Sequence, residues 1–139
     1  MKKFLVCCAL LISVAAFAGV DSRIKNVMNE LNTKYEVLDG GIYFKLKGYD
    51  VLLLTAGQDS LRGKGYPIAI ICKHNGTVST RMKDWMLKNS TSDNVGYWVL
   101  NQGKPCYKIV LPSDYTEKEL LMSMVVLIVK AEEFEKEFK

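Results

Sequence analysis

The sequence predicts an α+β domain in which an N-terminal helix, a middle helix and a long C-terminal helix cover an antiparallel sheet of about five or six strands. In three separate segments, apolar residues recur every three or four positions, the period of a helix that lies on a core. Between these segments, short apolar runs are bounded by Gly, Asn and Pro, as strands are. Strands that follow one another along the chain favour antiparallel pairing, and 139 residues are enough for about one domain.

The first eighteen residues predict a secretory signal peptide. Two lysines precede an almost wholly apolar run, residues 4–17, and Ala16-Phe17-Ala18 supplies the small residues that signal peptidase recognises. The apolar run is shorter than the roughly 20 residues that cross a bilayer. We therefore expect removal of residues 1–18 and export of residues 19–139 as one domain, periplasmic or secreted, with no membrane span after cleavage. A retained membrane anchor is the alternative.

The mature chain begins with a predicted helix over residues 22–35. Asp21 or Ser22 can cap its first turn, because a short side-chain oxygen accepts a hydrogen bond from a free backbone N–H group. Apolar side chains occupy one side of this helix and polar side chains the other, so the apolar side is expected to face the core. The apolar positions are Ile24, Val27, Met28, Leu31 and Tyr35.

Short apolar runs between residues 35 and 72 predict the first group of strands. Residues 42–47 alternate between apolar and polar, which is typical of a half-buried antiparallel strand. Residues 51–54 are all apolar and predict a more central strand, whereas the polar residues 58–66, with their glycines, predict an exposed loop. The predicted strands are residues 42–47, 51–54 and 68–72, the last opened by Pro67, with residues 35–38 as an optional short strand.

A second helix and a hairpin follow. Thr77 or Ser79 can cap the helix, and the polar residues 89–94 end it. Residues 95–100 and 106–111 are strand-like, and the turn signal between them predicts a hairpin that Pro112 brings to an end. The apolar face of the middle helix is predicted to consist of Val78, Met82, Trp85 and Met86.

The last predicted helix begins with a capping box. Thr116 can accept a hydrogen bond from the N–H of Glu119, and the Glu119 carboxylate can reach back to Thr116. Residues 120–129 are apolar nearly all round, which indicates burial on more than one side, by the sheet and by either the first helix or a second protomer. We favour a monomer slightly over a homodimer, because a chain this short needs its apolar contacts for one core. The predicted core stripe is Leu120, Met124, Leu127, Ala131, Phe134 and Phe138, widened by Leu121, Val125 and Ile128.

The residue inventory points away from catalysis, metal binding and nucleic acid. The net charge of +4 is mild, whereas a nucleic-acid site needs a concentrated basic face. The mature chain has no Cys-x-x-Cys or His-Glu-x-x-His motif and no Gly-rich phosphate loop. We therefore expect no catalytic, cofactor-binding or metal-binding residue, no cofactor and no nucleic-acid partner.

Two cysteines remain after cleavage. Cys72 and His74, the only histidine, would lie on one face of a strand, where a thiol and a base can cooperate. Side chains two residues apart are too distant for a good hydrogen bond, however, so a core thiol is favoured. A disulfide to Cys106 is disfavoured: Cys72 shares the core face with Ile70, whereas an inward Tyr107 places Cys106 on the other face.

Aromatic and apolar side chains are the candidates for a protein-binding surface, because aromatic residues with polar tips are enriched at interfaces. Tyr97 and Trp98 are neighbours in a strand and face opposite sides, so at least one should leave the helix-covered core unless both faces are covered. Core packing is the alternative for most of the aromatic residues. The candidate surface residues are Trp98, Tyr97 and Trp85, with Met122 and Val126 as dimer-interface candidates on the flank of the last helix.

The order of elements resembles the YbjN family, whose fold is similar to that of type III secretion chaperones. The resemblance covers nearly all of residues 19–139, and it implies helices on an antiparallel sheet, no cofactor and protein binding. The signal peptide and residues 58–66 depart from the simplest family pattern. The residues that carry the resemblance are Ser22–Tyr35, Asp39-Gly40-Gly41, Lys88-Asn89-Ser90, Gly96-Tyr97-Trp98-Val99 and the stretch from Tyr107 to Pro112 before the capped helix.

These observations together predict an exported, non-enzymatic module that binds an unknown protein partner or acts like a chaperone. The lack of a catalytic constellation disfavours the alternative of a small extracytoplasmic hydrolase or thiol-redox enzyme. An exported inhibitor is a further alternative that the sequence does not separate from a binding module.

Overall fold

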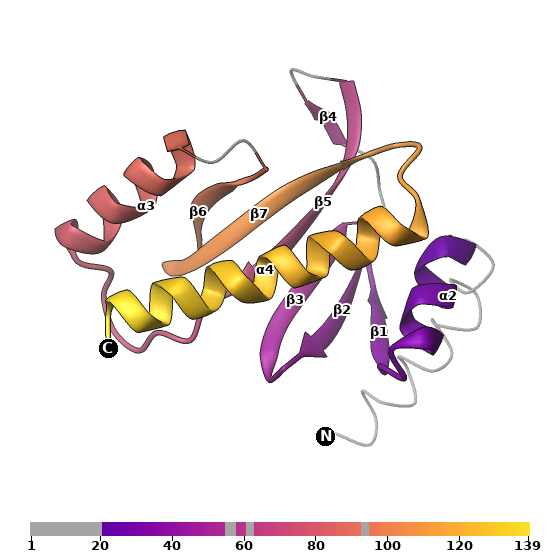
Figure 1. Cartoon of the computed structure of the whole chain (residues 1–139), viewed down its shortest axis with the longest axis horizontal. Coiled ribbons are helices and arrows are strands. Elements are labelled where there is room, and N and C mark those ends of the chain that lie inside the picture. The colour runs from indigo at the N-terminus through magenta and orange to yellow at the C-terminus, as the bar shows by residue number, and fades with distance from the viewer. Residues whose placement is uncertain (1–20, 55–57, 61–62, 93–94) are drawn as a thin grey trace.

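The computed structural model of the chain describes residues 21–54, 58–60, 63–92 and 95–139 (Figure 1). Within them, three helices and an antiparallel sheet form an α+β fold, as the sequence predicts. The predicted signal peptide, residues 1–18, lies outside the described residues. In chain order the elements are α2 (Ser22–Glu30), β1 (Tyr35–Leu38), β2 (Gly41–Leu46), β3 (Tyr49–Leu54), β4 (Gln58–Ser60), β5 (Gly63–Ile71), α3 (Thr80–Ser92), β6 (Tyr97–Asn101), β7 (Lys104–Pro112) and α4 (Glu117–Glu137).

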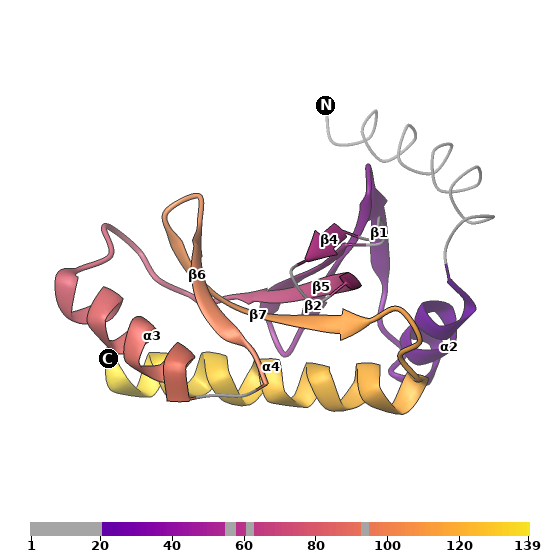
Figure 2. The same cartoon turned by 90° about the horizontal axis from the view of Figure 1, so that it is seen from above.

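The sheet has one continuous path of strands, in the order β1-β2-β3-β5-β7-β6, and β4 pairs with the end of β5 beside that path. Every pair of neighbouring strands is antiparallel. The described helices lie on one side of the sheet, with α4 running across it (Figure 2). This side is called the inner face below, and the side away from α4 is called the outer face.

The first helix is shorter than the sequence predicts. It ends at Glu30 in a Schellman motif, in which the N–H of Asn32 donates to Asn29 and the N–H of Thr33 donates to Met28. Asn32 adopts a φ of 49°, a left-handed conformation that asparagine tolerates better than most residues do. The prediction of helix through Tyr35 is therefore wrong. Tyr35 instead begins β1, the short strand that the sequence predicts as an option over residues 35–38.

Residues 58–66 are not the exposed loop that their polar character predicts. They form β4 and the start of β5, which pair as a hairpin. Gly65 is a close-approach position, because a Cβ atom there would lie 2.4 Å from Cγ1 of Val110 on β7. Its glycine therefore permits strand packing rather than marking a loop.

Pro67 lies inside β5 and does not open it, contrary to the prediction. Pairing of β5 with β3 stops at Ile68, and pairing with β4 starts at Gly65. Proline has no N–H group to donate. Pro67 lies between the residues of β5 that pair with β3 and those that pair with β4, so the missing N–H group interrupts neither pairing.

The hairpin of β6 and β7 confirms the predicted turn. Gln102 and Gly103 both adopt positive φ angles, 51° and 78°, as a type I′ turn requires.

The helix α3 binds the free edge of β6, because the backbone N–H of Trp98 donates to Oγ of Ser90 over 2.7 Å. Of the two predicted caps of α3, Ser79 is used, and its Oγ accepts from the N–H of Met82.

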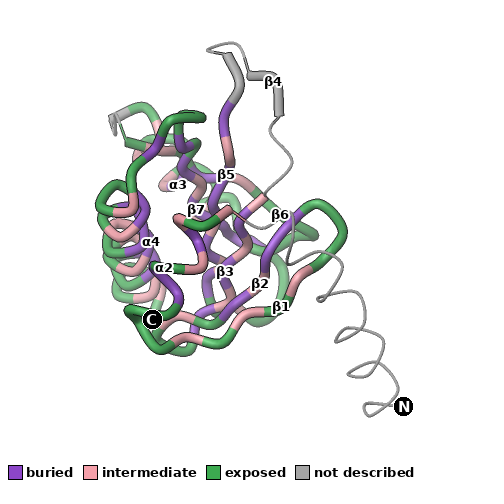
Figure 3. The backbone as a smooth tube through the Cα atoms, turned by 90° about the vertical axis from the view of Figure 1, so that its right-hand side faces the viewer, coloured by how far each residue is buried: buried purple, intermediate pink, exposed green. Residues whose placement is uncertain are grey.

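The capping box of α4 is present as predicted, with Glu119 N–H donating to Thr116 Oγ and Thr116 N–H donating to a Glu119 carboxylate oxygen. Most of the predicted stripe is buried, which Figure 3 shows as purple on the side of α4 that faces the sheet. Val125 was expected to widen this stripe, but it is 57 % exposed. The buried stripe residues are Leu120, Met124, Leu127, Ala131 and Phe134, and Phe138 is half-buried against them.

Candidate functional site

The five candidate surface residues do not form one surface. Trp98 is only 7 % exposed, and Trp85 is half-buried beside it. Tyr97 is 39 % exposed and lies on the outer face, whereas Trp98 points inward, so the expected split of these neighbours is observed. Met122, which is 58 % exposed, lies on the open side of α4, and Val126 is half-buried.

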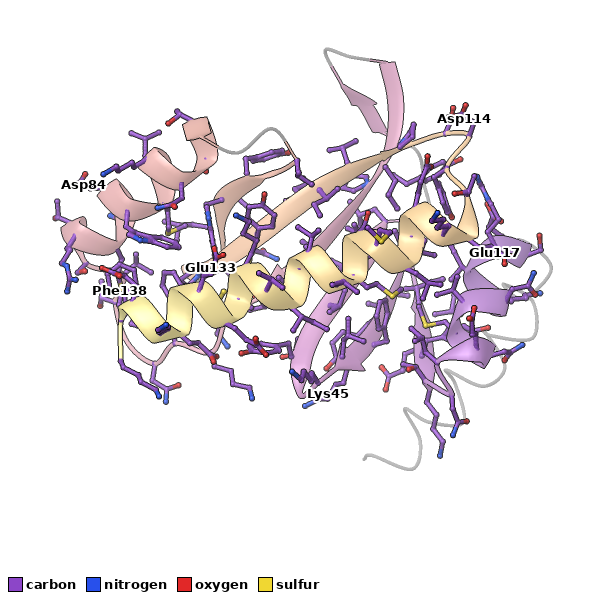
Figure 4. All side chains as sticks on the ribbon, viewed as in Figure 1. Lys45, Asp84, Asp114, Glu117, Glu133 and Phe138 are labelled. Atoms are coloured by element: carbon purple, nitrogen blue, oxygen red, sulfur yellow. The ribbon has the colours of Figure 1, made fainter. Side chains whose placement is uncertain are left out.

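The two tryptophans belong to an aromatic cluster of the core. Their ring centroids are 5.3 Å apart, and Phe134 of α4 lies 5.7 Å from Trp85 and 5.4 Å from Trp98. Phe138, which lies at the end of α4 beside α3, and Tyr107 of β7 extend the cluster (Figure 4). Trp98 Nε1 is buried without a hydrogen-bond partner, so its surroundings are aromatic rather than polar. This cluster joins α3 and α4 to the sheet and presents little surface to a partner.

The outer face of the sheet is unusually apolar. Antiparallel sheets with one helix-covered face normally carry polar side chains on the other face. Here one row of cross-strand neighbours runs from Tyr43 through Leu52, Ala69 and Lys108 to Tyr97. The register places these further apolar side chains on the same face: Leu38, Leu54, Pro67, Ile71, Val99, Cys106 and Val110.

No described helix covers this outer face, which Figure 2 shows on the side opposite α4. Leu38, Tyr97 and Val110 are 44 %, 39 % and 37 % exposed, and Leu52 and Ile71 are half-buried. Pro67 and Cys106 on the same face are buried, so the exposed and half-buried apolar side chains lie around them. Exposed apolar side chains on an uncovered sheet face mark a candidate interaction site.

The outer face could have been found from the sequence. Residues 51–54 and 68–71 are uninterrupted apolar runs, and such runs are typical of strands with apolar environments on both faces. The run of residues 51–54 predicts a central position in the sheet, but the two runs imply more than that. They also imply that Leu52 and Ala69 point away from the core, which the register confirms.

The charges on the outer face are distributed unevenly. Asp50 accepts a hydrogen bond from the Tyr43 hydroxyl, with 2.5 Å between the oxygens, and lies 3.8 Å from Nζ of Lys45. The hydrogen bond from Tyr43 to Asp50 is also the main reason why the pKa of Tyr43 is raised to about 12. Lys108, by contrast, is half-buried in the apolar row and makes no ion pair within the described part of the chain.

Cys72 and His74 do not form a nucleophile–base pair in this geometry. Cys72 is 2 % exposed on the inner face, and burial raises the pKa of its thiol, which therefore stays protonated at neutral pH. Nε2 of His74 lies 3.3 Å from the carbonyl oxygen of Thr77, and its ring packs on Phe134. Among the described residues, no group of three or more His, Cys, Asp or Glu side chains is placed to hold a metal ion.

In a chain of residues 19–139, we expect the thiols of Cys72 and Cys106 to react slowly with a thiol reagent at pH 8 and rapidly after denaturation. Cys72 and Cys106 are buried and free, and burial raises the pKa of Cys106 to about 11, which leaves roughly one thiolate per thousand at pH 8. Unfolded thiols ionise near pH 9, so the stability contributed by these buried thiols is complete below that pH and is lost as the pH rises toward 11 and beyond.

Colorimetric titration of thiols, with and without denaturant and without reductant, checks this prediction. The unfolded chain should show two reactive thiols. A mass lower by two hydrogens, restored by a reductant, would reveal a disulfide and contradict the prediction.

Comparison with known proteins gives no match to a family model, a curated protein or a solved structure. The described helices include none that combines the length and the apolar character needed to cross a membrane.

Proposed function

We propose that this chain is an exported, non-enzymatic module that binds polypeptides, and that the outer face of its sheet is the binding surface. The observation that carries the proposal is the apolar row across five strands on a face that no described helix covers. Burying this row against a partner would remove exposed apolar area from water, the main favourable term in most protein association. The resemblance to the YbjN family supports the same class of function.

The proposal predicts that the exported chain binds an unfolded polypeptide. A suitable probe is fluorescently labelled, reduced and carboxymethylated α-lactalbumin, and its anisotropy reports binding. Val110→Glu places a charge among the apolar side chains of the outer face, so the affinity should decrease by about tenfold or more. Val125→Glu is the matched control, because Val125 is exposed on the opposite side of the molecule, on α4.

The control should bind as wild type does. If Val110→Glu binds as tightly as wild type, or if only Val125→Glu loses affinity, the outer face is not the binding surface. Circular dichroism of each variant verifies that it is folded.

Export is part of the proposal and has its own test. The basic and apolar residues before Ala18 support cleavage at that position. Mass spectrometry of the exported protein should then find Gly19 at its N-terminus. An intact Met1 in the exported soluble fraction would contradict the proposal.

A further inference from the structure

We infer that the partner segment is acidic as well as apolar, and that it places a carboxylate on Lys108 with apolar side chains on either side. This inference rests on the proposed function and specifies the chemistry of the partner. It depends on where Lys108 lies, on which charges surround it and on the strand that contains it.

Lys108 lies within the apolar surface, not at its rim. Its cross-strand neighbours are Ala69 on β5 and Tyr97 on β6. The next outward-facing residues of β7 are Cys106 on one side and Val110 on the other, each about 7 Å along the strand. A polypeptide that covers the apolar row must therefore also cover the Lys108 ammonium group.

The acidic groups of the outer face do not neutralise Lys108. Glu36 is at the far end of the same row, on β1, four strand spacings or about 19 Å away, which is more than a Debye length at physiological salt. Asp50 is two strands away and already has Tyr43 and Lys45 as partners. In the described part of the chain, Lys108 makes no ion pair.

The cost of removing water from the Lys108 ammonium group then determines which partner segments can bind. An apolar or basic segment over Lys108 would bury an ammonium group without a counter-charge, which is strongly unfavourable. A carboxylate at that position removes this penalty and adds a charge-assisted hydrogen bond. Lys104, two outward positions further along β7, adds positive charge at the exposed end of the strand. The surface therefore favours a segment in which an acidic residue is flanked by apolar ones.

The test uses the exported chain and three short labelled peptides that differ only in a central Glu, Gln or Lys between alternating valines. Wild type should bind the Glu peptide most tightly and the Lys peptide at least about tenfold more weakly. Lys108→Glu should reverse this order, and Lys108→Met should remove the preference while keeping apolar binding. Lys83→Glu, an equal charge change on an exposed position of α3, should leave the order unchanged.

The outcomes separate this inference from the proposed function. Equal binding of the three peptides, with Val110→Glu still reducing the binding of unfolded polypeptide, would overturn the acidic preference and leave the binding surface in place. If neither Val110→Glu nor Lys108→Glu reduced polypeptide binding, both the acidic preference and the proposed binding surface would be overturned. Light scattering that shows a wild-type dimer, split by Lys108→Glu, would show that a second copy covers this face and would overturn the acidic partner. Binding to phosphatidylglycerol vesicles in preference to the Glu peptide would overturn it as well.

Discussion

Replacing Phe134 by alanine is expected to lower the free energy of unfolding by about 3–5 kcal/mol, the range for truncation of a buried phenylalanine. Phe134 is 1 % exposed, so nothing fills the space that its ring leaves. The substitution also removes the aromatic contacts of that ring with Trp85, Trp98 and Phe138, whose centroids lie within 5.7 Å. Because Phe134 joins α3, β6 and α4, its loss weakens three elements at once.

Urea denaturation followed by circular dichroism measures this effect. Val125→Ala on the same helix is the matched control, since Val125 is 57 % exposed, and it should change stability by less than about 0.5 kcal/mol. A Phe134→Ala midpoint equal to that of the control would show that the aromatic cluster is not a core.

A substitution of Gly96 by alanine is expected to cost about 3 kcal/mol or more, through overlap with the backbone of β7. A Cβ atom at Gly96 would lie 2.4 Å from the carbonyl oxygen of Lys108 and 3.0 Å from side-chain atoms of Tyr107 and Ile109. The clash with a backbone oxygen cannot be relieved by a side-chain rotation, so β6 must move away from β7. Movement of β6 would also displace Trp98 from the aromatic cluster.

Gly76→Ala separates this overlap from simple backbone strain. Gly76 has a φ of 95° but no atom within 4 Å of a built Cβ, so its substitution should cost only about 1–2 kcal/mol. Equal losses of stability for the two variants, measured by urea denaturation, would argue against close packing at Gly96.

Local signals made the C-terminal part of the chain predictable. The capping box at Thr116, the helical stripe that follows it and the turn at Gln102 and Gly103 act over a few residues, and each is present in the structure. The loop prediction over residues 58–66 failed because strand pairing decides their structure. Gly65 pairs with Gln58 on β4 and with Pro112 on β7, and the second neighbour is far away in the sequence.

The candidate site was predictable only in part, for a related reason. Aromatic character identified Trp85 and Trp98, but pairing and helix packing decide which aromatic side chains are buried, and both tryptophans pack in the core cluster. That Tyr97 and Trp98 face opposite sides was predicted correctly, because strand alternation is a local rule, but which of the two lies outside the core was not predicted. Lys108 gave no signal by itself, since its meaning comes from the apolar neighbours that the register brings beside it.

The position of α4 has a consequence for the order in which the chain is synthesised. This helix follows every strand of the sheet in the sequence, and it packs on β5 and β7 as well as on α2, where Asn26 hydrogen-bonds to Glu117. Until α4 has left the ribosome, β5 and β7 lack the helix that covers them and the core is incomplete. A nascent chain therefore cannot complete this core before residues 117–137 have been synthesised, so folding of the domain has to follow the synthesis of α4 rather than proceed strand by strand.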